Sequence, residues 1–160
     1  MADDFGLRIG VEGEKEFKKA LAEINQSFKV LGSEMKLVSS QFDKSDSSVQ
    51  ALSARNTVLN KEIDAQRQKV ETLRSALQNA AESFGENDRR TQNWQVQLNN
   101  AEAALNGMER ELSQNEQAIE ALNNQEEQAV DATERLTQEI SRQEEELAGL
   151  KRAYSNAVLE

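Results

Sequence analysis

The sequence contains no cysteine, no histidine and no proline, and each absence excludes a class of structure or chemistry. Without cysteine there can be no disulfide framework and no thiolate metal ligand. Without histidine, the usual proton shuttle and the commonest metal-binding side chain are missing. Without proline, a long helix meets none of the breaks that this residue imposes. We therefore expect neither a disulfide scaffold nor a zinc site.

Apolar side chains are also scarce for a chain of 160 residues, since 37% of residues are hydrophobic and 4% are aromatic. A compact domain of this length buries about two-thirds of the surface of its unfolded chain. A mean hydropathy of -0.77 does not supply such a core, so the composition indicates an elongated protein or disorder. The spacing of the apolar residues must decide between the two.

Positive charge is in short supply as well, with a net charge of -10 and a pI near 4.7. Such a chain repels the phosphates of nucleic acids and of anionic lipids, so we expect neither as a partner. The acidic start Met1–Phe5 lacks the features of a signal peptide, and no stretch of about 18 residues is continuously apolar. The sequence thus predicts no membrane span and a cytoplasmic site of synthesis.

The apolar residues that are present recur every three and four positions, which is the heptad pattern of a coiled coil. With Leu21 as position a, 32 of the 41 a and d positions between Phe17 and Ala157 are apolar. We call this set of a and d residues the seam. Its large members, the candidate self-association residues, are Phe17, Leu21, Ile24, Phe28, Leu31, Met35, Val38, Phe42, Leu59, Ile63, Val70, Leu73, Leu77, Phe84, Trp94, Leu98, Leu105, Met108, Leu112, Ile119, Leu122, Leu136, Ile140, Leu147, Leu150 and Tyr154.

Two polar stretches cross the seam without shifting its phase. The pattern predicts an amphipathic helix over 13–42, a polar linker or turn at 43–48, a coiled-coil helix over 49–84, a turn at 85–88 and a coiled-coil helix over 89–160 that continues further. Because a hairpin has no need to preserve phase, the pattern favours one nearly continuous helical path. Helical hairpins at the two stretches are the alternative. Either way, the fold class is all-α.

The first 12 residues differ from the rest. Leu7, Ile9 and Val11 alternate with Arg8 and Gly10, which predicts a short strand that must pair with a partner.

Some polar residues occupy seam positions, where burial costs stability and where they commonly fix register or oligomeric state. We expect this role for Asn56, Gln66, Asn115 and Gln143. Glu126, at an a position, is more in keeping with a loosely packed layer.

Groups that could carry chemistry are few. Glu126 with Glu127, and the run 144–146, are the densest carboxylates, but neighbouring positions on a helix diverge by about 100°. The stretch 43–48 lacks the glycine and terminal acid of a calcium loop, and no glycine-rich nucleotide loop is present. Arg89 and Arg90 beside Trp94 could bind an anion, but they fit the start of a helix or a turn better. We expect no enzyme activity, cofactor or metal.

Two segments resemble a known family. Residues 5–17 (FGLRIGVEGEKEF) and 23–37 (EINQSFKVLGSEMKL) are similar to the start of tape measure proteins from tailed phages and prophages of Gram-positive bacteria. Residues 83–94 (SFGENDRRTQNW) and 98–112 (LNNAEAALNGMEREL) are similar to the segment that follows in the same proteins.

The resemblance implies a structural protein of virion assembly, packed in several copies inside the tail tube, whose length sets the length of the tail. It implies contacts with copies of itself, tail tube protein, tail assembly chaperones and tail tip proteins. It also implies a location in the host cytoplasm during assembly and then in the tail lumen. Family members are much longer, so we expect an N-terminal part of such a protein. The alternative is a coiled-coil adaptor or scaffold that binds a partner through its N-terminal segment.

Overall fold

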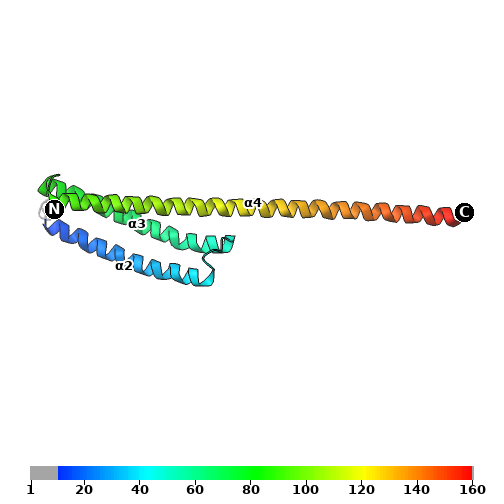
Figure 1. The fold of residues 1–160 in the computed structure, drawn as a ribbon, viewed down its shortest axis with the longest axis horizontal. Coiled ribbons are helices and arrows are strands. Elements are labelled where there is room, and N and C mark those ends of the chain that lie inside the picture. Colours follow the sequence, from blue (N-terminus) through cyan, green and yellow to red (C-terminus); the bar gives the residue numbers. More distant parts are fainter. Residues whose placement is uncertain (1–10, 160) are drawn as a thin grey trace, which may run out of the picture. The chain divides into compact units, whose positions relative to one another are not determined.

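The computed structural model describes residues 11–159, which form three helices: α2 (Val11–Gln41), α3 (Val49–Phe84) and α4 (Arg89–Leu159) (Figure 1). The all-α prediction is confirmed, and within residues 11–159 there is no strand. The strand expected at residues 1–12 lies outside the described residues except for its end, where Val11 already begins α2.

The chain divides into two compact units, residues 1–119 and 120–160. In its described part, unit 1 holds α2, α3 and the N-terminal part of α4, whereas unit 2 is the remainder of α4.

The first reversal of the chain, between α2 and α3, is built from polar side chains. Ser48 caps α3, because its hydroxyl accepts a hydrogen bond from the backbone N–H of Ala51 at 3.2 Å. The Asp46 carboxylate accepts one from the Ser48 N–H at 2.8 Å. This bond and a second one from the Ser48 hydroxyl lower the pKa of Asp46. Arg55 reaches back to donate to the carbonyl oxygens of Asp46 and Asp43, at 2.6 and 2.9 Å.

The second reversal, between α3 and α4, depends on Gly85. Its φ of +85° is the one positive φ among the described residues, and glycine reaches that region without strain. The Gly85 N–H donates to the carbonyl of Ala81, and the Gly85 carbonyl accepts from the Thr91 hydroxyl at 2.7 Å. Hydrogen bonds from the side chain and backbone of Arg90 lower the pKa of Asp88 just before α4 begins.

Pairs across the helices give their directions within unit 1. Lys61 pairs with Glu34 and Lys69 with Asn25, so α3 runs antiparallel to α2. Arg67 pairs with Glu109 and Arg74 with Glu102, so α4 runs antiparallel to α3. The single continuous path that the phase favours is therefore not the arrangement found, and hairpins stand at both polar stretches. The reason is that an a/d stripe packs against a neighbouring helix in either direction, so phase alone cannot report a reversal.

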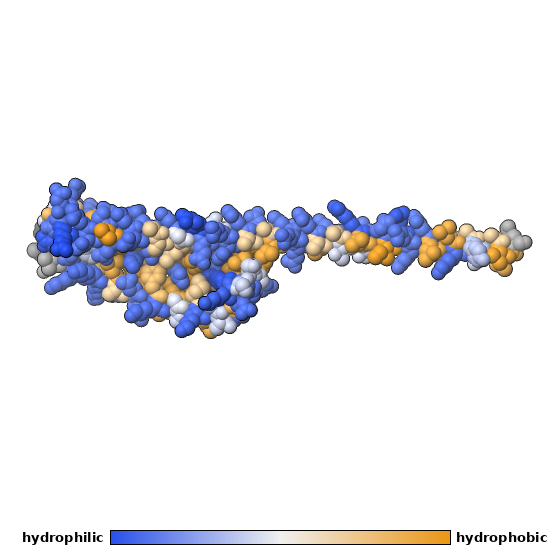
Figure 2. Space-filling model, viewed as in Figure 1, coloured by the Kyte–Doolittle hydropathy of each residue, from blue (hydrophilic) through white to orange (hydrophobic). Residues whose placement is uncertain are grey.

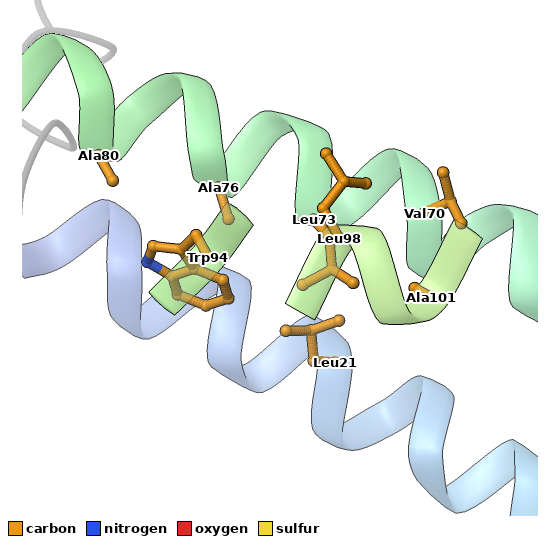
Figure 3. Packing of buried hydrophobic residues seen from close by; sticks show 8 residues of the cluster. All are labelled: Leu21, Val70, Leu73, Ala76, Ala80, Trp94, Leu98 and Ala101. Atoms are coloured by element: carbon orange, nitrogen blue, oxygen red, sulfur yellow. The ribbon is translucent and has the colours of Figure 1, made fainter. Parts of the chain in front are cut away.

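The core of unit 1 lies where the three helices meet (Figure 3). Trp94 from α4, 4% exposed, lies against the small side chains of Ala76 and Ala80 from α3. Leu21 from α2, Leu73 from α3 and Leu98 from α4 form the next layer, and Leu73 is fully buried. Small residues opposite one large indole let the helices pack closely.

The middle helix buries more than its seam. Ala51, Val58 and Ala65 at c positions and Ala76 at a g position are all buried in α3. These residues were absent from the predicted seam. They are buried because α3 packs against α2 on one side and α4 on the other, so a wider face of the helix is covered.

Candidate functional site

The seam is the candidate site, and the structure divides it into a covered part and an uncovered part. From Phe17 to Leu122, each large seam residue is buried or half-buried. From Leu136 to Tyr154, each one is exposed. The exposed fractions are 64% for Leu136, 55% for Ile140, 52% for Leu147, 68% for Leu150 and 73% for Tyr154. Within residues 11–159, the covered part of the seam thus ends close to the boundary between the two units.

Two polar seam residues pair with each other across α3 and α4. The side-chain amide of Asn115 donates to the Asn56 side-chain oxygen at 2.9 Å, and Asn56 is 8% exposed. A buried amide without a partner is costly, so this pair favours one register of α4 against α3.

A third polar seam residue, Gln66, is 4% exposed and also bridges the two helices. Its side-chain N–H donates to the backbone carbonyl of Ala101 at 2.9 Å. That carbonyl also belongs to a helix, so the bond requires close approach of the two backbones, which the small side chain of Ala101 permits.

The fourth, Gln143, lies in unit 2 and is exposed. It donates to Glu139 of its own helix at 3.2 Å. Arg142 binds Glu139 and Glu146 on the same helix face, so these charges are already paired locally. The hydrogen bond from Arg142 lowers the pKa of Glu139.

The charges that flank the covered seam are arranged for an antiparallel neighbour. Arg67 and Arg74 of α3 bind Glu109 and Glu102 of α4 at 3.0 and 2.9 Å. Glu62 is the exception: burial and the nearby charge of Glu111 raise its pKa. One like-charged contact is therefore tolerated inside unit 1.

The groups considered for chemistry do not converge on a site. Glu126, Glu127 and residues 144–146 are all exposed on a single helix. Arg90 lies over the ring of Phe84, with its guanidinium carbon 3.4 Å from the ring centroid, and also binds Asp88. Trp94 is buried in the core, so it does not join Arg89 and Arg90 in an anion site. Among residues 11–159 there is no group of three or more potential metal ligands.

None of the described helices combines the length and apolarity needed to cross a membrane. Comparison with protein-family models, with curated proteins and with solved structures gives no match to this chain.

Proposed function

We propose that this chain is a structural, non-enzymatic protein of the phage tail, of the tape measure type, which sets tail length as a helical ruler. The observation that carries the proposal is the seam, which keeps one phase from Phe17 to Ala157 in segments that resemble tape measure proteins. A helix has a fixed rise per residue, so its length is a measure, and a coiled-coil register lets copies associate along it.

The ruler state requires the two turns of unit 1 to open into helix. The spacing of the seam residues on either side of each turn supports this step. Phe42 and Val49, which flank the first turn, are both a positions, and so are Phe84 and Thr91, which flank the second. Each reversal therefore spans a whole heptad, and converting it to helix would leave the seam in one line. Neither turn contains proline, which would prevent that conversion. Opened completely, residues 11–159 would form a helix of roughly 220 Å.

In this proposal the chain is made in the host cytoplasm and ends in the tail lumen, in contact with further copies, tail tube protein, assembly chaperones and tail tip proteins. The segment that precedes α2 would pair as a strand with one of these partners. No cofactor or metal takes part, and neither nucleic acid nor membrane is bound specifically.

The test is to delete four heptads, residues 122–149, in the phage that encodes the chain, and to measure tails by electron microscopy. Deletion of whole heptads preserves the phase, so the expected result is a tail shorter by about 42 Å. A matched control replaces the same 28 residues with a duplicate of heptads from 94–121, which keeps the length and should leave the tails unchanged.

A coiled-coil adaptor is the second candidate, and the closed three-helix arrangement of unit 1 favours it. An adaptor presents a folded surface and does not need to open. If the deletion blocked assembly, while any tails that formed kept their normal length, the adaptor function would be supported and the ruler function would be rejected.

A further inference from the structure

The described structure leaves one long apolar stripe without a partner in its own unit. Unit 2 consists of one helix, and its large seam residues from Leu136 to Tyr154 are more than half exposed. Figure 2 shows hydrophobic surface recurring along the C-terminal part of α4, between hydrophilic patches. We call the a and d residues from Glu126 to Ala157, which are all exposed, the free stripe.

The free stripe continues an interface that unit 1 already uses. Through Trp94, Leu98 and Ala101, the same a and d positions of α4 pack against α3. Asn115 pairs with Asn56, and α3 has only seven residues before Asn56. Only about two turns of α3 precede Asn56. The seam of α4, by contrast, continues in phase for several heptads after Asn115.

The residues beside the free stripe indicate what covers it. At the flanking e and g positions from residue 123 to residue 137 stand Asn123, Gln125, Val130, Ala132 and Thr137, none of which is charged. A basic partner helix would be matched by acidic residues at these positions, because flanking charges select the partner of a coiled coil. Uncharged flanks impose no such requirement.

The acidic residues of unit 2 lie mostly elsewhere on the helix. Glu120, Glu127 and Glu134 at b positions and Asp131 at an f position face away from the stripe. The two acidic g residues, Glu139 and Glu146, are both bound by Arg142 of the same helix. Glu144, at an e position, is an acidic residue that also flanks the stripe. Most of the negative charge of one copy, but not all of it, is therefore kept away from the stripe of another.

We infer that the free stripe is the site at which a second copy of this chain binds. Identical stripes match each other in length and spacing, and pairing covers apolar side chains that a lone amphipathic helix leaves in water. The seam within unit 1 is already occupied inside the chain and does not contribute to this first contact. The inference rests on the self-association in the proposed function and locates it in one part of the seam.

One residue opposes this contact. Glu126 occupies an a position, where a charged side chain is desolvated when a second helix covers it. Replacing it by leucine therefore tightens the association if the stripe is the contact, and has no such effect if the contact lies elsewhere.

The test is sedimentation equilibrium on the purified full chain over a range of concentrations. The chain with its natural residues is expected to have the mass of two or more copies. Leu136→Asp should weaken association by at least about tenfold, which corresponds to 1.4 kcal/mol. Leu37→Asp is the matched control, because Leu37 is an exposed leucine of α2, at 61% compared with 64% for Leu136, and lies outside the seam. Glu126→Leu should tighten association.

A chain that stays monomeric throughout would overturn the inference, and so would equal effects of Leu136→Asp and Leu37→Asp. Failure here is separable from failure of the proposed function. If tail length follows the heptad deletion while the purified chain is monomeric, the ruler stands and the free stripe does not bind a copy. If the chain associates through the stripe while tail length ignores the deletion, the reverse holds.

Discussion

Asn115 donates its side-chain amide to the side-chain oxygen of Asn56 at 2.9 Å, and so joins two seam positions that lie 59 residues apart in the sequence. The pair exists only because α4 runs antiparallel to α3. Two leucines at these positions could pack in several registers. The two asparagines pair their amides in one register, so they favour that register.

Removing one member of this pair leaves the other amide unpaired. Asn115→Ala should lower the free energy of unfolding by roughly 1–3 kcal/mol, because Asn56 remains buried without its partner. The double variant Asn56→Ala, Asn115→Ala should lose less than the sum of the two single changes. Urea unfolding of the four chains measures the coupling. Effects that add within about 0.3 kcal/mol would mean that the pair does not interact.

Glycine is predicted to be needed at position 85 because of the backbone conformation there, and not because a larger side chain would clash. A Cβ at this position would meet nothing within 4 Å, but the φ of +85° is strained for any other residue. Gly85→Ala should lower stability by about 1 kcal/mol. Gly107→Ala is the control: Gly107 is helical and also open, so the change should raise stability by about 0.5–1 kcal/mol. Thermal unfolding of both variants shows whether each change raises or lowers stability. A change in the same direction for both would mean that the positive φ of Gly85 does not matter.

The core of unit 1 should depend strongly on Leu73, which is fully buried between its neighbours. Leu73→Ala should cost about 2–5 kcal/mol, since the cavity cannot close completely among packed helices. Leu37→Ala removes the same atoms from a side chain that is 61% exposed, and helix propensities of the two residues are similar. Denaturant unfolding should show almost no change for this control.

The dependence of stability on pH has contributions of both signs. The pKa of Asp46 and Asp88 is lowered by their hydrogen bonds, so their contribution is present above the unfolded pKa and is lost as pH falls through the folded pKa. The pKa of Glu62 is raised by burial and by Glu111, so its ionised form destabilises unit 1 at neutral pH.

Glu62→Gln should therefore stabilise the chain at pH 7. This gain should disappear as pH falls below the unfolded pKa of glutamate, because the natural side chain is then neutral in both states. Glu127→Gln, on the exposed surface of unit 2, is the control and should change stability little at either pH. The comparison requires unfolding curves at about pH 7 and about pH 4. A gain that persists at low pH would show that the charge of Glu62 is not the cause.

The sequence predicts some of these features well and others not at all. The all-α fold follows from the heptad spacing and the lack of proline, and the chain reverses at the two polar stretches where Ser48 and Gly85 supply a cap and a positive φ. Direction could not be predicted, because the stripe packs equally well against a parallel or an antiparallel neighbour.

The sequence also could not predict which seam residues are buried and which are exposed. Leu73 and Leu136 occupy the same d position of their heptads, yet one is fully buried and the other is 64% exposed. Periodicity shows that a side chain has a place on an apolar face, but not whether the chain itself supplies the partner. Ala76 was missed for a related reason, since only the three-helix arrangement shows that α3 is covered on two sides.

The most direct test of the ruler function is to measure the distance between residues 25 and 69 in the purified chain and in assembled tails. In the closed form of unit 1 their side chains are 3.4 Å apart, although they are separated by 44 residues. Fluorescent labels on Asn25→Cys and Lys69→Cys can be placed specifically, because the chain has no cysteine of its own. Energy transfer between them should be high in the purified chain. In assembled tails the extended helix should separate the two labels by about 66 Å, the length of 44 residues of helix, so energy transfer should be low. High transfer in assembled tails would show that the hairpin stays closed there, and would contradict an extended ruler.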